Sequence, residues 1–183
     1  MKVSYCKTKF SALAAILFIL GGATSHAKTL GDTLRESKWD GIIGTWVDPK
    51  TKGQNRKVTY AWKVKDHAIL ATDATFGTNS VAIMGRNAKD GTLFHVGTDS
   101  KGTSVLGKWT FKSGVAVLEL AFVTGDGVEG VMKIRYTKKD NNTLVVSLEG
   151  LGPQPIVYTM VKVKTATKAP RNAPKTPFNP KRL

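Results

Sequence analysis

Few side chains of this 183-residue chain are suited to acid–base or metal chemistry. His67 lies in a polar, turn-like segment, where a solvated residue is expected. His95 lies among apolar residues, and alternation along the strand directs it into a buried interior. There it is either a neutral histidine hydrogen-bonded to a neighbour, or a ligand or base. Two histidines so far apart do not form a recognisable zinc site, so we predict no metal.

The thirteen acidic residues fall mostly in turn-like segments. Asp126 and Glu129 flank a predicted hairpin, where turn chemistry or loose cation binding would explain them. Glu119 interrupts the apolar run 115–122. We expect its side chain to face outward, because an unpaired inward charge is costly. The alternative is an inward carboxylate that meets a cationic group of a ligand.

Nucleophilic groups are equally scarce. No serine lies in the strand-to-helix context of a nucleophile elbow, and the single cysteine is Cys6, near the N-terminus. The segment Gly125-Asp126-Gly127 lacks the following helix that makes a glycine loop an anion site. We therefore predict no catalytic residue and no cofactor, and we favour a binding or interaction protein over an enzyme.

Residues 1–27 have the three parts of a secretory signal peptide. Basic residues precede an apolar stretch at 11–22, and Ser25-His26-Ala27 supplies the small residues that signal peptidase reads. The stretch is shorter than the roughly 20 apolar residues of a membrane span. Cleavage near Ala27 predicts a secreted protein, periplasmic or extracellular, that begins at Lys28. An uncleaved membrane anchor is the alternative.

Residues 165–183 form a basic, proline-rich tail with four prolines and no acidic residue. Its basic residues are Lys168, Arg171, Lys175, Lys181 and Arg182. A segment with so little apolar surface cannot order itself, so we predict that it is disordered. The tail either holds the protein to an anionic surface, such as envelope polymer or lipid headgroups, or only keeps it soluble.

The segment between these ends, residues 39–164, alternates apolar and polar residues with a period of two, as at Tyr60 and Trp62. Turn signals recur about every 8 to 12 residues and leave no room for crossover helices. We predict an all-β fold, an antiparallel up-and-down meander of about 8–10 strands closed into a barrel. An open sandwich is the alternative. Residues 28–38 predict a short helix over one end of the barrel.

The first predicted strand opens with Gly44-Thr45-Trp46, which places a large ring where it would plug one end of the barrel. A Gly-x-Trp triplet between a short helix and a β-meander resembles the lipocalin and calycin group. The secreted setting is similar to that of bacterial lipocalin-like barrels of uncharacterised function. The resemblance implies structural roles for Gly44 and Trp46.

The chain departs from this resemblance at two places. The arginine expected over the tryptophan, near the end of the last strand, has only Lys162 or Lys164 in its place. The segment Arg135-Tyr136-Thr137 is out of register with the Arg-x-Tyr motif of the fatty-acid-binding relatives. No ligand-binding residue therefore carries over from these families.

Aromatic side chains are spread over the predicted strands, and we expect them to line the interior. They predict a small, largely apolar ligand inside the barrel, with a packed core and no ligand as the alternative. The candidate ligand-binding residues are Tyr60, Trp62, Phe76, Phe94, His95, Trp109 and Tyr136. We expect a monomer without a specific nucleic-acid partner, whose partners are this ligand and an anionic envelope surface.

Overall fold

The computed structural model describes residues 27–164. Most of the predicted signal peptide and the whole of the predicted tail, residues 165–183, therefore lie outside the described residues. The elements follow in the order α1 (Leu30–Glu36), the 3-10 helix η1 (Asp40–Ile42), β1 (Gly44–Val47), β2 (Arg56–Val64), β3 (Ala68–Thr75), β4 (Thr78–Arg86), β5 (Leu93–Asp99), β6 (Ser104–Lys112), β7 (Val115–Val123), β8 (Glu129–Asp140), β9 (Thr143–Glu149) and β10 (Ile156–Lys162).

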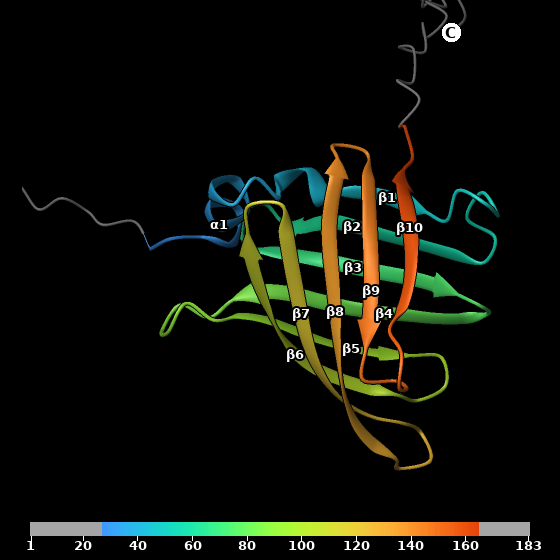
Figure 1. Cartoon of the computed structure of the whole chain (residues 1–183). Helices are drawn as coiled ribbons and strands as arrows, with labels where there is room; N and C mark the ends of the chain where they lie inside the picture. Colours follow the sequence, from blue (N-terminus) through green and yellow to red (C-terminus); the bar gives the residue numbers. More distant parts are fainter. Residues whose placement is uncertain (1–26, 165–183) are drawn as a thin grey trace, which may run out of the picture.

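The ten strands form one closed antiparallel barrel. Each strand pairs with the next along the chain, and β1 closes the barrel by pairing with β10. In Figure 1, β8, β9 and β10 run steeply across the direction of β2 to β5. The predicted all-β up-and-down barrel with a short N-terminal helix is confirmed, at the upper end of the expected strand number.

Alternate residues of each strand face the interior, as the period of two requires. The buried core draws apolar side chains from all ten strands, from both helices and from the segment between them. It comprises Leu30, Leu34, Trp39, Ile42, Trp46, Tyr60, Ile69, Ala71, Ala82, Met84, Leu93, Trp109, Ala116, Leu118, Leu120, Tyr136, Leu144, Val146 and Met160. Burial of this apolar surface is the main favourable contribution to folding.

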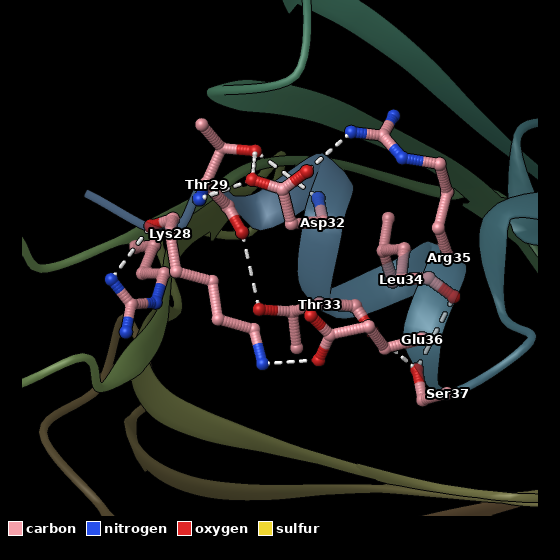
Figure 2. Close-up of polar contacts among 9 residues, drawn as sticks. Lys28, Thr29, Asp32, Thr33, Leu34, Arg35, Glu36 and Ser37 are labelled. Atoms are coloured by element: carbon pink, nitrogen blue, oxygen red, sulfur yellow. Dashed lines mark hydrogen bonds and ion pairs between the residues drawn. The ribbon is translucent and has the colours of Figure 1, made fainter. Parts of the chain in front are cut away.

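Helix α1 and η1 cover one end of the barrel, which we call the capped end (Figure 1). The helix begins at a capping box, in which Thr29 and Asp32 each accept a hydrogen bond from the backbone N–H of the other (Figure 2). Arg35 then joins Asp32, at 2.7 Å, to Asp66 in the β2–β3 loop, at 2.9 Å. Leu34 faces inward and is fully buried. The helix is therefore fixed by its own cap and by a loop of the barrel.

Two tryptophans hold the capped end together. The indole N–H of Trp39 donates to the carbonyl of Lys112 at 2.9 Å, so the segment after the helix is tied to the end of β6. The indole N–H of Trp46 donates to the carbonyl of Ile42 at 2.8 Å, and its ring is only 2% exposed. Trp46 is thus buried at the place predicted for the plug.

The opposite end of the barrel, which we call the mouth, carries the loops that follow β1, β3, β5, β7 and β9. Inward-facing side chains nearer the mouth keep some solvent exposure, whereas Leu30, Leu34, Trp39 and Ile42 at the capped end have none. Within residues 27–164, no helix has the length and apolar character that a membrane span requires.

Candidate ligand site inside the barrel

An aromatic wall lines the interior along β5, β6 and β8. The ring of Trp109 stacks on that of Phe111, with 5.3 Å between centroids and 12° between planes. Tyr136 packs on Trp109 at 5.4 Å, and the imidazole of His95 meets the indole edge-on at 6.0 Å. Aromatic faces of this kind bury large apolar groups at little cost in side-chain entropy.

His95 is part of this wall and is 8% exposed. The indole N–H of Trp109 donates to its Nδ1 at 3.3 Å, so the ring hydrogen of the neutral imidazole lies on Nε2. Burial lowers the pKa of His95 to about 4, because the protonated form loses its hydration. His95 is therefore a buried neutral histidine hydrogen-bonded to Trp109, and its Nε2–H is left as a donor towards the interior.

Tyrosine hydroxyls and one carboxyl make the inner face polar nearer the mouth. The hydroxyl of Tyr60 donates to that of Tyr136 at 3.5 Å, and burial raises the pKa of both phenols. Both phenols therefore stay protonated at neutral pH and keep their donors. Burial also raises the pKa of the Asp73 carboxyl, while the Thr75 hydroxyl and the charge of Arg56 act in the opposite direction.

Arg56 begins β2 at the mouth. Its guanidinium carbon lies 3.4 Å from the ring centroid of Tyr158 in β10 and 5.3 Å from that of Phe76. In residues 27–164, the arginine side-chain hydrogen bonds and ion pairs belong to Arg35, Arg86 and Arg135. Arg56 is thus held in place by aromatic faces while its N–H groups remain free to bind an acceptor.

The barrel is least tightly closed beside Arg56. Strand β1 pairs with β10 at two positions, Trp46 with Lys162 and Val47 with Val161, whereas β9 pairs with β10 at six. The first part of β10 consequently runs past the end of β1 towards the mouth. A pocket of about 460 Å³ lies at this seam, between β10 and the loop after β1. It is lined by Asp48, Pro49, Lys50, Arg56, Phe76, Ile156, Val157, Tyr158 and Thr159.

Five of the seven candidate ligand-binding residues face the interior. Tyr60, His95, Trp109 and Tyr136 are buried there, and Trp62 is half-buried, packed against the core. The sequence had identified all five from their position in alternating segments.

Two candidates lie elsewhere, and their expected interior position is wrong. Phe76 is in the β3–β4 turn with a φ of 46° and is 69% exposed, because the chain reverses there instead of continuing the strand. Phe94 directly precedes His95 and so faces outward; its ring lies over Gly85, its pairing partner in β4. A glycine without a side chain leaves room for such a ring on the sheet.

Three residues of the site were not identified from the sequence: Arg56, Asp73 and Tyr158. The alternation in the last strand does place Tyr158 on the face of Met160, and that signal was available. The position of Arg56 depends on the seam between β2 and β10, which local patterning does not reveal.

The remaining polar candidates serve the structure of the barrel. Glu119 faces outward, as expected, and pairs with Lys133 on the neighbouring strand at 3.1 Å. Asp126 accepts a hydrogen bond from the Thr124 hydroxyl within the β7–β8 turn, so turn chemistry accounts for it. In the described part of the chain, no three His, Cys, Asp or Glu side chains gather as a metal site.

The architecture defines a class, the closed antiparallel ten-stranded barrel, that is consistent with a calycin-like fold. No protein-family model and no curated protein matches the chain.

Proposed function

We propose that the barrel binds one small, largely apolar molecule in its interior and that the molecule enters at the seam beside Arg56. The observation that carries this proposal is the free guanidinium of Arg56, which borders a pocket of about 460 Å³. Tyr158 also lines this pocket, and the bonded hydroxyls of Tyr60 and Tyr136 and the aromatic wall line the interior that the ligand would enter. Barrels of eight strands hold at most one small ligand, and ten strands leave more room.

The polar end of the ligand is expected to be a hydrogen-bond acceptor, and a carboxylate fits best. Arg56 and Lys50 both line the pocket and are cationic. The carboxylate of Asp48 already accepts from the backbone of Lys50 and from the hydroxyl of Thr51, so it is engaged within its own loop. A fork of guanidinium donors matches a carboxylate geometrically. The apolar body would then lie against Trp109 and Tyr136.

Native mass spectrometry of the protein from its own host tests the proposal directly, because a bound molecule would add a defined mass. A fluorescent fatty-acid probe and its neutral methyl ester test the role of Arg56. We expect Arg56→Met to weaken binding of the acid by about tenfold, since one charge-assisted contact is lost, and to change binding of the ester little. Arg135→Met, on the outer face, is the matched control. If no molecule co-purifies and neither probe binds, the proposal is contradicted and a packed core without a ligand is favoured.

We also propose that the protein acts after export and that its basic tail contacts an anionic surface. Both statements rest on the sequence, in residues 1–27 and 165–183. N-terminal sequencing of the exported protein is expected to begin at Lys28; a retained Met1 in a membrane fraction would contradict the export proposal.

A further inference from the structure

A row of apolar side chains crosses the outer face of the barrel from β3 to β8. Cross-strand pairing aligns Leu70, Ile83, Val96, Leu106, Ala121 and Val131, one residue from each strand. Ile83 is 50% exposed, Leu106 62% and Val131 71%. With about 4.8 Å between strands, the row is roughly 24 Å long. Single exposed apolar residues are ordinary, but a continuous row of them indicates a contact surface.

A second row, one step closer to the capped end, alternates in charge. It consists of Lys108, Glu119, Lys133 and Glu149, which are aligned on β6, β7, β8 and β9. Glu119 and Lys133 form an ion pair within the molecule. Lys108 and Glu149 lie three strands apart and do not pair with each other; Glu149 also lies 3.6 Å from Arg135 of β8. The row has no net charge.

The two rows meet in a groove of about 670 Å³ on the outer face. Leu106, Ala121 and Val131 form its apolar part, and all four members of the charged row also line it. A second hollow of about 600 Å³ shares the same three apolar residues and extends to the ends of β6 and β7 at the mouth. The outer face of β6 to β8 is thus hollowed where its apolar side chains are most exposed.

We propose that this face binds the same face of a second copy of the chain, about a two-fold axis that runs parallel to the strands between β7 and β8. Such an axis reverses the order of the strands while keeping each row at its own level. Lys108 then meets Glu149 of the second copy, and Glu119 meets Lys133 of the second copy. Ala121 is brought opposite Val131 in the same way. The charged row is therefore self-complementary, as a two-fold contact requires, and the apolar row contributes the facing pair Ala121 and Val131 at its exposed end.

The alternating row favours a second copy over an anionic membrane. A membrane surface attracts basic side chains of one sign, whereas Glu119 and Glu149 would be repelled by it. A second copy offers the opposite charge at every position. This proposal differs from the monomer expected from the sequence, because composition does not show which outward residues align.

Sedimentation velocity of the full chain over a wide concentration range tests the proposal. The contact is small, so we expect a reversible dimer with a dissociation constant on the order of 10 µM. Leu106→Lys and Val131→Lys each place a charge within the apolar part of the contact and are expected to weaken the dimer by at least about tenfold. Thr72→Lys, on the exposed outer face of β3, is the matched control and should leave the constant unchanged. Circular dichroism melts check that each variant is folded.

Charge reversal tests the two-fold axis itself. Lys108→Glu alone and Glu149→Lys alone each place like charges opposite each other and should each weaken the homodimer. An equimolar mixture of the two variants restores both intermolecular pairs and should form a heterodimer as tight as the parent dimer. An intramolecular role for either residue would not be rescued by mixing.

Three outcomes overturn the proposal. The first is a parent protein that stays monomeric at high concentration. The second is a dimer whose stability Leu106→Lys and Val131→Lys do not change. The third is a monomer that floats with lipid vesicles only while Leu106 and Val131 are intact, which would make lipid the occupant of the groove.

Discussion

Lys162 and Trp46 are directly paired across the seam between β1 and β10. The ammonium of Lys162 lies 5.6 Å from the indole centroid and donates to the carbonyl of Gly41 at 2.7 Å. Gly44 has a φ of 129°, and a Cβ there would lie 2.8 Å from Cε of Lys162. The lysine thus occupies the place over the tryptophan where the lipocalin resemblance expects an arginine, and the glycine leaves room for it.

Replacing Lys162 removes this contact while keeping the apolar stem. We expect Lys162→Met to lower the free energy of unfolding by about 1–3 kcal/mol, from the lost cation–π contact and the lost charged hydrogen bond. Lys162→Arg should retain most of the stability. Urea unfolding measures both, with Lys164→Met, at an exposed position two residues further on, as the control. Equal stability of the two methionine variants would show that the pairing contributes nothing.

Trp46 is the larger partner in the same contact. We expect Trp46→Ala to cost roughly 3–5 kcal/mol, as aromatic truncations in cores do. The ring is 2% exposed and its N–H is bonded to Ile42, so both packing and a hydrogen bond are lost. Trp62→Ala, at a half-buried position, should cost clearly less. A melting temperature within a degree or two of the parent would exclude Trp46 as the plug.

His95 predicts a loss of stability in acid. Its pKa is about 4 in the folded state and 6.5 in the reference state, so the unfolded chain binds a proton first as pH falls. Stability therefore rises with pH between about 4 and 6.5, by roughly 3 kcal/mol in total from this group, and is constant outside that window. Protonation at Nδ1 would also break the bond from Trp109.

Urea unfolding at a series of pH values measures this slope. His95→Gln keeps an acceptor for Trp109 but does not titrate, and it should flatten the dependence between pH 4 and 6.5. His67→Gln, in the β2–β3 turn, is the control. If His95→Gln shows the same slope as the parent, acid destabilisation comes from other groups.

The basic tail, which begins after residue 164, is tested by truncation. We expect a chain ending at Thr165 to melt at the parent temperature, because residues 166–183 add no predicted core. Its binding to anionic vesicles at low salt should be weaker, because five cationic groups are lost; such attraction is screened beyond about 8 Å at physiological ionic strength. A lower melting temperature would mean that the tail is docked. Unchanged vesicle binding would assign the interaction to the barrel itself.

Much of this fold follows from local rules that the sequence displays. Turn residues and a period of two predict the strands, and the same period separates inward His95 from outward Glu119. Because Phe94 is next to inward-facing His95, the period of two places Phe94 on the outer face. The interior position was expected because Phe94 is aromatic, against this alternation. Phe76 was misplaced because the turn between β3 and β4 consists of only two residues, Phe76 and Gly77, both with positive φ. An aromatic residue in so short a turn looks, in the sequence, like the last residue of the strand.

The candidate site was less predictable because it depends on strands that are distant in the sequence. In the sequence, Arg56 is distinguished only by being a charged residue at the start of β2. Its stacking on Tyr158 exists because β1 is short and leaves β2 and β10 close to each other at the mouth. The aligned outer rows likewise require the register of seven strands, β3 to β9, which no single strand contains.

The seam also determines the order in which the barrel is completed. The pairing of β1 with β10 brings together distant parts of the chain, and the hydrogen bond from Lys162 to Gly41 beside it joins residues 121 positions apart. Every other strand pair joins consecutive strands. Such distant contacts have a large loop-closure cost and form late. Until β10 is synthesised and reaches β1, the growing sheet has two open edges that are able to pair with other chains. The last few residues of the barrel are therefore those that protect the whole from aggregation during its synthesis.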